Sequence, residues 1–162
     1  MARVYVGIGS NVERELRIRQ AVEALREAFG TIELSPVYDS VAVGFDGSNF
    51  LNLVAAFDSE LEVEAVAAVF REIEDRLGRD RSLPKFASRP IDLDILLYGD
   101  AIVDLPGIRI PRPEIVVNAF VLKPLQDIAP ELPHPETGQS FAELWRGMRP
   151  DAPELTRVEL DL

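Results

Sequence analysis

The positions of apolar residues predict a regular series of strands and helices in the first hundred residues. Apolar residues alternate or form short runs where a strand is expected, and recur at spacings of three and four where a helix is expected. The predicted elements are a strand at 4–8, a helix at 18–29, strands at 31–38 and 50–57, a helix at 63–77 and a strand at 91–97. This β-α-β-β-α-β order is the ferredoxin-like arrangement, an α+β fold. We therefore expect a mainly antiparallel sheet with the two long helices packed on one face.

Turn and capping signals mark the ends of several elements. The sequence Gly-Ser-Asn at 9–11 predicts a turn that caps the following helix. Capping-box patterns begin at Ser59 and Ser140, each with a glutamate three residues later. A mostly apolar helix is expected near 114–127, and the tail from residue 150 could add a strand. We therefore expect C-terminal helical additions to the ferredoxin-like core.

Composition restricts the classes of function. A chain of 162 residues, 47% of them hydrophobic, has the size of a single domain over residues 1–162. It has no cysteine and His134 is its only histidine, which excludes thiolate metal sites and histidine-rich zinc sites. A net charge of −11 argues against nucleic-acid binding. With no signal-like or membrane-spanning apolar stretch, we expect a cytoplasmic protein.

Two aspartates interrupt the most apolar of the predicted strands. Residues two apart in a strand point to the same face, so Asp92 and Asp94 share a face and their apolar neighbours take the other. Their Cα atoms should lie roughly 6–7 Å apart, and carboxylates this close repel each other unless a cation joins them. Magnesium prefers such oxygen ligands and completes its shell with water or phosphate oxygens. The pair indicates a magnesium site or, alternatively, the solvated face of an edge strand.

A cluster of positive charge precedes the aspartates. The segment contains Arg79, Arg81, Lys85 and Arg89, opposed only by Asp80, which gives it a net charge of +3 (four cations less one aspartate). Arginine suits bidentate phosphate contacts and neutralises charge that develops during phosphoryl transfer. A cationic loop beside a carboxylate pair is what a polyphosphate site needs, although a solvated run of charge would look the same.

The remaining motifs leave the ligand open. The chain has no Walker A sequence and no kinase glycine loop. The segment 7–11 could cradle an anion with its backbone N–H groups, or could be a tight turn alone. Phe50, Phe86 and Phe120 lie in or near predicted loops, where they could hold a flat ring or belong to the core.

Several short motifs together resemble one enzyme family. They are Gly9-Ser10-Asn11, Phe50-Leu51-Asn52, Glu74 with Gly78, Arg79 and Arg81, Arg89 with Asp92-Leu93-Asp94, Pro111, Phe120-Val121-Leu122, Pro124-Leu125 and Ile128-Ala129-Pro130. Over about residues 4–135 the chain resembles the 6-hydroxymethyl-7,8-dihydropterin pyrophosphokinases of folate biosynthesis. The resemblance implies transfer of pyrophosphate from ATP to the pterin hydroxymethyl group, release of AMP, and two Mg²⁺ ions bound with ATP.

The resemblance also implies roles for individual residues. Asp92 and Asp94 would hold both metal ions, and Arg79 and Arg89 would stabilise the transferring group. Glu74 would lie near ATP, and we expect Arg81, Lys85 and Arg112 to bind the nucleotide as well. The implied pterin-binding residues are Ser40, Val41, Val43, Phe50, Asn52, Phe86 and Phe120.

The chain departs from the family pattern at a few positions. It has Ala87-Ser88 where the family usually has Gly-Pro, and Phe86 where it usually has Trp. Arg112 and Asn118 stand where His and Arg are common. These departures motivate an alternative, a diverged paralogue that binds pterin or nucleotide with little turnover. A third hypothesis is a ferredoxin-like interaction domain without chemistry.

Overall fold

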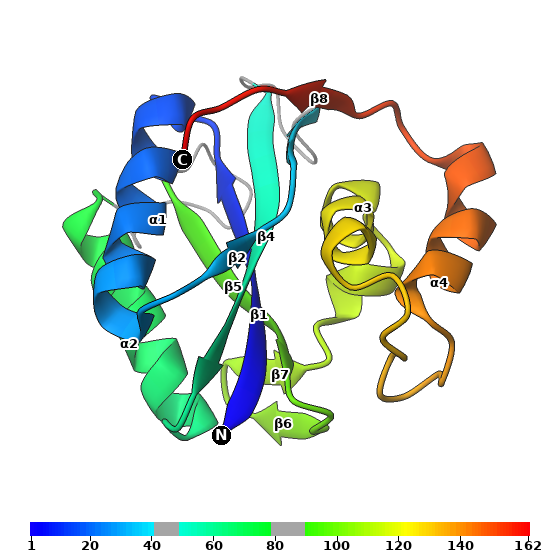
Figure 1. Ribbon diagram of the computed structural model, residues 1–162, viewed down its shortest axis with the longest axis horizontal. Coiled ribbons are helices and arrows are strands. Elements are labelled where there is room, and N and C mark those ends of the chain that lie inside the picture. The colour runs from blue at the N-terminus through cyan, green and yellow to red at the C-terminus, as the bar shows by residue number, and fades with distance from the viewer. Residues whose placement is uncertain (41–48, 79–89) are drawn as a thin grey trace.

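The computed structural model describes residues 1–40, 49–78 and 90–162, and in these ranges a six-stranded sheet lies between helices (Figure 1). Its strands are β1 (Ala2–Ser10), β2 (Glu33–Leu34), β3 (Val37–Ser40), β4 (Phe50–Ser59), β5 (Asp92–Tyr98) and β8 (Thr156–Val158). Two more strands, β6 (Val103–Leu105) and β7 (Ile108–Ile110), form a separate hairpin. The α-helices are α1 (Arg14–Phe29), α2 (Val63–Arg76), α3 (Ala119–Ile128) and α4 (Phe141–Met148). Short 3-10 helices are η1 (Pro113–Val116) and η2 (Arg149–Asp151).

The order of the strands confirms the predicted fold class. The sheet runs β5-β1-β4-β3-β8, with β2 also paired to β4, and each of these pairings is antiparallel. The first four strands of this order give the ferredoxin-like arrangement, and α3, α4 and β8 are additions to it. Within the described ranges, none of the helices is long and apolar enough to cross a membrane.

The helices α1 and α2 cover one face of the sheet, as predicted. Alternate residues of β1, namely Val4, Val6 and Ile8, are at most 1% exposed and belong to the core beneath these helices. There the ring of Phe29 stacks on Phe57 with centroids 4.1 Å apart. Each large apolar side chain buried in this way stabilises the fold by about 1.5–3 kcal/mol.

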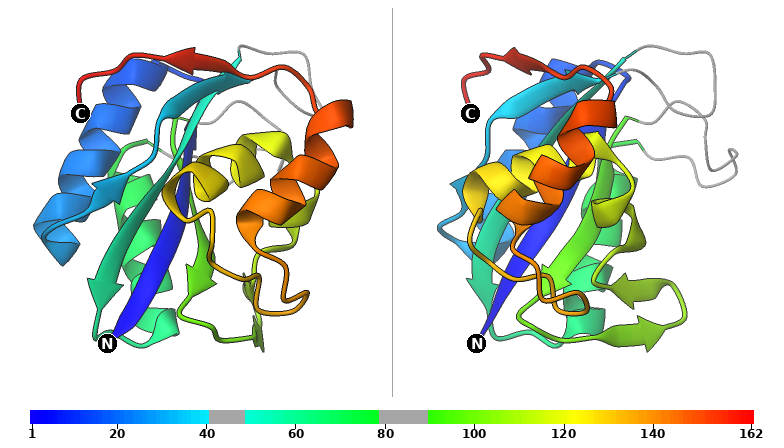
Figure 2. Two further views of the ribbon diagram at one scale, coloured as in Figure 1. Left: turned by 45° about the vertical axis from the view of Figure 1, so that its right-hand side comes forward. Right: turned by 90° about the vertical axis from the view of Figure 1, so that its right-hand side faces the viewer.

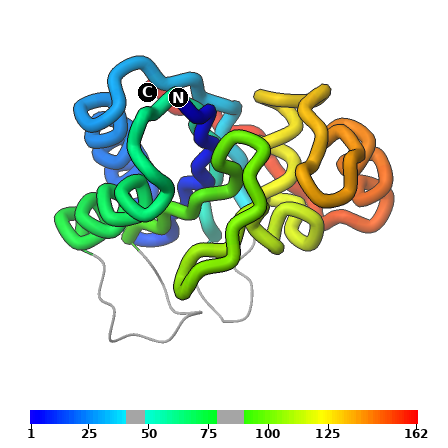
Figure 3. The backbone as a smooth tube through the Cα atoms, turned by 90° about the horizontal axis from the view of Figure 1, so that it is seen from below, coloured from blue at the N-terminus to red at the C-terminus, as the bar shows by residue number. Residues whose placement is uncertain are grey.

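The added helices α3 and α4 cover the opposite face (Figure 3). A second apolar cluster joins Tyr5, Val54 and Leu96 of the sheet to Leu122 of α3 and Phe141 of α4. The sheet is therefore buried on both sides, and its central strands carry apolar residues at almost every position.

The turn predicted at 9–11 is wrong. β1 continues through Ser10, and Gly9 and Ser10 pair with Asn52 and Leu51 of β4. The helix α1 begins only after Glu13, whose φ of 46° is left-handed and which makes no side-chain cap. Strand partners on both sides of β1 thus outweigh the local turn signal. The anion cradle that the sequence left open for 7–11 is not favoured either, because Gly7 to Ser10 pair in the sheet.

Two other predicted boundaries also shift. The strand expected at 31–38 is divided into β2 and β3, because Pro36 has no N–H to continue the ladder. Ser59 does not cap α2: it ends β4, and its Oγ accepts a hydrogen bond from the N–H of Leu61 at 3.1 Å. The residue at the N-cap position is Glu62.

The capping box at Ser140 and the added C-terminal strand are both confirmed. Ser140 Oγ accepts the N–H of Glu143 at 3.1 Å at the start of α4. The tail then crosses from α4 to the sheet, where β8 pairs with β3 (Figure 2). Beyond β8, the carbonyl of Asp161 accepts a hydrogen bond from Arg19 Nε of α1 at 3.4 Å.

The only histidine holds the turn between α3 and α4 together. His134 is 5% exposed, and its Nδ1 accepts the backbone N–H groups of Glu136 at 3.1 Å and Thr137 at 3.3 Å. Its ring lies edge-on to Phe141, with centroids 6.1 Å apart. Burial lowers the pKa of His134, although the charge of Glu136 opposes the shift.

We predict that acidification weakens the fold through His134. Because the pKa of His134 is lower in the folded protein, the unfolded chain binds a proton more readily. The contribution of the neutral ring to the free energy of unfolding is therefore fully present above about pH 6.5 and is lost as pH falls below it. Protonated Nδ1 cannot accept the two backbone bonds, which together contribute about 1–2 kcal/mol. Urea unfolding at pH 8 and pH 5.5 should show a larger loss for wild type than for His134→Asn, whose amide oxygen accepts without titrating. Equal losses in the two proteins would contradict this role.

Candidate active site

The register of the sheet aligns several predicted site residues in one row. Gly9 of β1 pairs with Asp92 of β5 on one side and with Asn52 of β4 on the other, and Tyr38 of β3 continues the row. Directly paired residues point to the same face. Leu93, beside Asp92, packs in the core under α1 and α2, so the row faces the α3 side. With strands about 4.8 Å apart, the Cα atoms of Asp92 and Asn52 are about 10 Å apart, with a glycine between them.

Three predicted substrate-binding residues meet at one end of this row. Asn52 Nδ2 donates a hydrogen bond to Ser40 Oγ at 2.7 Å, and both side chains are buried. A Cβ at Gly9 would lie 2.8 Å from Asn52 Oδ1 and 3.8 Å from Phe50 Cδ1. Gly9 is therefore required by the close approach of Asn52 to the backbone of β1, rather than by a turn.

The helix α3 is fixed over this end of the row by a polar network. Asp127 accepts hydrogen bonds from the Tyr38 hydroxyl, from Lys123 Nζ at 2.8 Å and from Gln126 Nε2 at 2.5 Å. Burial and the bond to Asp127 raise the pKa of Tyr38, so its hydroxyl remains a donor at neutral pH. Phe120 precedes Asp127 by two helical turns and shares its face of α3. The network therefore positions this half-buried phenylalanine as well.

The predicted metal ligands lie on the same face at the other end of the row. Asp94 pairs with Gly7 as Asp92 pairs with Gly9, so no side chain separates the aspartates from β4. Burial, and then the charge of Asp92, raise the pKa of Asp94 to about 7. The Asp94 side chain is still 32% exposed, so a hydrated cation can reach it. A divalent cation would relieve the cost of this charge.

An ion-pair chain already links Asp94 to the start of η1. Arg112 NH2 lies 3.3 Å from Asp94 Oδ1, and Arg112 Nε lies 2.9 Å from Glu114 Oε2. The backbone N–H of Arg112 donates to the carbonyl of Leu96 at 3.0 Å, which holds the residue beside β5. The structure thus brings Arg112 into contact with a carboxylate predicted to bind metal, and its contact with nucleotide stays a prediction.

Glu74 has a clear position on the opposite side of β5. It projects from α2, is 5% exposed, and accepts the backbone N–H of Leu93 at 2.9 Å. Since Leu93 lies between Asp92 and Asp94, Glu74 fixes the strand that carries them. Its charge also contributes to the raised pKa of Asp94. Its predicted contact with nucleotide stays a prediction.

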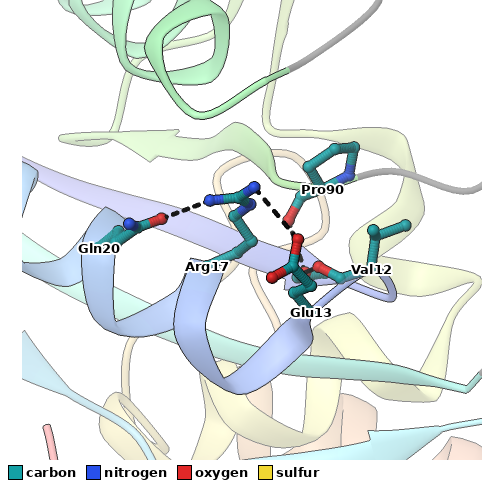
Figure 4. Close-up of polar contacts among 6 residues, drawn as sticks. Val12, Glu13, Arg17, Gln20 and Pro90 are labelled. Carbon is teal, nitrogen blue, oxygen red and sulfur yellow. Dashed lines mark hydrogen bonds and ion pairs between the residues drawn. The ribbon is translucent and has the colours of Figure 1, made fainter.

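Ser10 has a structural role that the sequence analysis missed, because it assigned this residue to a turn. Its hydroxyl donates to the carbonyl of Pro90 at 2.5 Å and approaches the carbonyl of Val12 at 3.3 Å. Figure 4 shows the Pro90 carbonyl beside Val12 and Glu13, near Arg17 at the start of α1. Ser10 therefore anchors the chain immediately before β5 and after the cationic segment. No local signal reveals a contact between residues 80 positions apart.

Arg14 is a second residue that the sequence analysis missed. Its NH1 lies 2.9 Å from Asp39 Oδ2 and donates to the carbonyl of Asn49 at 3.3 Å. Asp39 directly precedes Ser40, and Asn49 directly precedes Phe50, so Arg14 ties together the two strands that present these residues.

Several predicted site residues lie outside the described ranges. They are Val41, Val43, Arg79, Arg81, Lys85, Phe86 and Arg89. Within the described ranges, no group of three or more acidic, histidine or cysteine side chains is arranged to hold a metal ion. Asp92 and Asp94 would therefore supply two protein ligands, which suits an ion whose other ligands are phosphate oxygens and water.

Solved structures place this arrangement in a known fold. The crystal structure of Plasmodium falciparum HPPK-DHPS wild type with pteroate matches 93% of this chain with a TM-score of 0.75 and 14% sequence identity. The chain spans only 43% of the length of that protein. At this level of identity the likeness shows the fold alone.

Sequence comparisons then give the family. The model of 7,8-dihydro-6-hydroxymethylpterin-pyrophosphokinase (HPPK) matches residues 5–130. A 2-amino-4-hydroxy-6-hydroxymethyldihydropteridine pyrophosphokinase of Pseudomonas aeruginosa is 39% identical over 146 residues, 88% of this chain and 89% of the relative. One from Aquifex aeolicus is 36% identical over 137 residues, 83% of this chain and 85% of the relative. The chain belongs to the HPPK family, which confirms the resemblance inferred from its motifs.

Proposed function

We propose that the chain transfers pyrophosphate from ATP to 6-hydroxymethyl-7,8-dihydropterin and releases AMP, as a cytoplasmic step of folate biosynthesis performed by one domain over residues 1–162. Family membership supports the reaction. The observation that carries it is the row that aligns Asp92, Gly9 and Asn52 across three strands. One end of the row has carboxylates suited to metal-bound phosphates, and the other has a buried amide suited to a flat heterocycle.

The proposed cofactor is Mg²⁺, as two ions bound with ATP. Asp92 and Asp94 would hold them, because carboxylates are the hard oxygen donors that Mg²⁺ prefers. The raised pKa of Asp94 and the guanidinium of Arg112 beside it both support a site for positive charge. When bound, magnesium neutralises phosphate charge. Arg79 and Arg89 are proposed to stabilise the transferring group, while Glu74, Arg81, Lys85 and Arg112 contact the nucleotide.

The protein itself would orient the acceptor. Asn52 would bond to the edge of the pterin, near Ser40, Val41 and Val43. The rings of Phe50, Phe86 and Phe120 would pack on its faces. The hydrogen bond from Asn52 to Ser40 fixes the amide, so Oδ1 is the atom that remains to accept from the pterin. These contacts would hold the hydroxymethyl group near the phosphates, and such orientation of the two reactants would accelerate the transfer.

One assay tests this function directly. The purified chain, ATP, Mg²⁺ and the reduced pterin should release AMP and form the pyrophosphorylated pterin at ordinary enzyme rates, about 1–100 s⁻¹ for kinases. Omission of Mg²⁺ should stop the reaction. Pterin binding without AMP release would instead support the diverged paralogue, and neither binding nor turnover would support the interaction domain.

We predict that Gly9→Ala weakens pterin binding more than it weakens nucleotide binding. The added Cβ would lie 2.8 Å from Asn52 Oδ1, so the amide must move from its place beside Ser40. We expect the dissociation constant for pterin, measured by calorimetry with a non-hydrolysable ATP analogue, to rise about tenfold or more, the equivalent of about one lost hydrogen bond.

Gly147→Ala is the matched control for this prediction. Gly147 is in α4, and a Cβ there meets nothing within 4 Å. Pterin affinity should be unchanged in this variant. If Gly9→Ala bound pterin as tightly as Gly147→Ala does, Asn52 would not be a pterin ligand.

A further inference from the structure

Arg112 occupies a position that is unusual for a nucleotide-binding cation. Its guanidinium lies 3.3 Å from Asp94 Oδ1, one of the two oxygens of a carboxylate proposed to bind metal. Asp92 lies on the same face of β5 and adds a second negative charge beside this carboxylate. The guanidinium therefore supplies positive charge to the site without any bound metal.

The contacts of Arg112 allow it to move. Its side chain is 29% exposed, so the pair with Asp94 is not sealed from water. Glu114 Oε2 lies 2.9 Å from Arg112 Nε, yet this oxygen has no aligned hydrogen-bond donor among the described residues, so the contact is an ion pair of poor geometry. Only the backbone is fixed, by the bond from the Arg112 N–H to Leu96. A half-exposed ion pair of this kind contributes little and can be exchanged.

We propose that Arg112 is a displaceable counter-ion of the metal site. Without nucleotide its guanidinium neutralises Asp94. When metal and ATP arrive together, Arg112 leaves Asp94, whose oxygen becomes a metal ligand, and pairs with the phosphates instead. The inference rests on the proposed function for the identity of the ligand, and the ion pairs of Arg112 carry it.

The exchange has a consequence for metal bound without nucleotide. A divalent ion at Asp94 is repelled by the guanidinium, and this repulsion is not compensated until phosphates attract the arginine away. Arg112 would thus keep metal binding weak until ATP is present.

The test is a titration with Mn²⁺ alone, followed through the free-ion signal in electron paramagnetic resonance at pH 8.5 and low salt. Arg112→Gln should bind Mn²⁺ about three- to fivefold more tightly than wild type, because the guanidinium no longer competes with the ion for Asp94. The same variant should bind the metal complex of a non-hydrolysable ATP analogue about tenfold more weakly, because a charge-assisted contact to phosphate is lost.

Two variants serve as controls. Arg109→Gln removes the same charge from an exposed position on β7, three residues earlier, and should leave Mn²⁺ affinity within about twofold of wild type at this exposure. Asp94→Asn combined with Arg112→Gln should lose the gain. A gain no larger than that of Arg109→Gln, or one that survives Asp94→Asn, would overturn the proposal.

These outcomes are separate from those of the turnover assay. If wild type turns over while Arg112→Gln binds Mn²⁺ no more tightly, the counter-ion proposal fails and the proposed function stands. If Mn²⁺ binding tightens while wild type forms no product, the proposed function fails and the role of Arg112 at Asp94 stands.

Discussion

Asp92→Ala and Asp94→Ala are each expected to lower turnover by about a thousandfold or more, the equivalent of several kcal/mol of lost charge stabilisation. Both carboxylates lie on the α3 face of β5 and neither belongs to an apolar cluster. Their removal takes away mutual repulsion, so the fold should be retained. Steady-state rates in saturating Mg²⁺, together with thermal unfolding, measure the two effects separately.

Asp100→Ala is the matched control for these variants. Asp100 is exposed in the turn that follows β5, at the other end of the strand from Asp92, so its substitution removes the same charge outside the site. Its turnover should remain close to that of wild type. If Asp92→Ala or Asp94→Ala were as active as this control, the metal assignment of that aspartate would be wrong.

Arg89→Ala is expected to lower kcat far more than it weakens ATP binding. Arg89 directly precedes Pro90, whose carbonyl is held by Ser10 Oγ at 2.5 Å, so the chain is anchored one residue away. A cation tied to a fixed point acts effectively on charge that develops in a transition state. The loss of one such preorganised donor costs about a hundredfold to a thousandfold in rate. Ground-state ATP retains its contacts with the other cations.

The measurements are kcat and ATP affinity for Arg89→Ala and Arg89→Lys. Lysine should restore little, because it lacks the planar fork of arginine. A collapse of ATP affinity with kcat near wild type at saturation would make Arg89 a binding residue only. The role in the transition state would then pass to Arg79 or Arg81.

Local pattern was sufficient to predict most of the fold. The spacing of apolar residues at 18–29 and 63–77 located α1 and α2, and the alternation around Asp92 and Asp94 placed both on one face of the strand, opposite their apolar neighbours. The capping box at Ser140 was also readable, because its two partners are three residues apart. In each case the interacting groups lie within one element.

The features that could not be predicted depend on partners distant in the chain. Gly9 and Ser10 have the composition of a turn, yet they lie in β1 because β4 and β5 pair with it from both sides. The hydrogen bond from Ser10 to Pro90 and the ion pair of Arg112 with Asp94 join separate elements. Family motifs marked these positions as important without revealing what each side chain contacts.

The two outer strands of the sheet also bear on aggregation. An exposed strand edge is a template for pairing with another chain, and proteins protect such edges with charge or with very short strands. At the β5 edge, the carboxylate of Glu74 accepts a hydrogen bond from the N–H of Leu93. At the other edge, β8 covers β3, and β8 is only three residues long and carries exposed Arg157. A chain cut before β8 would present Val37–Ser40 as an open edge, and we would expect it to associate with copies of itself.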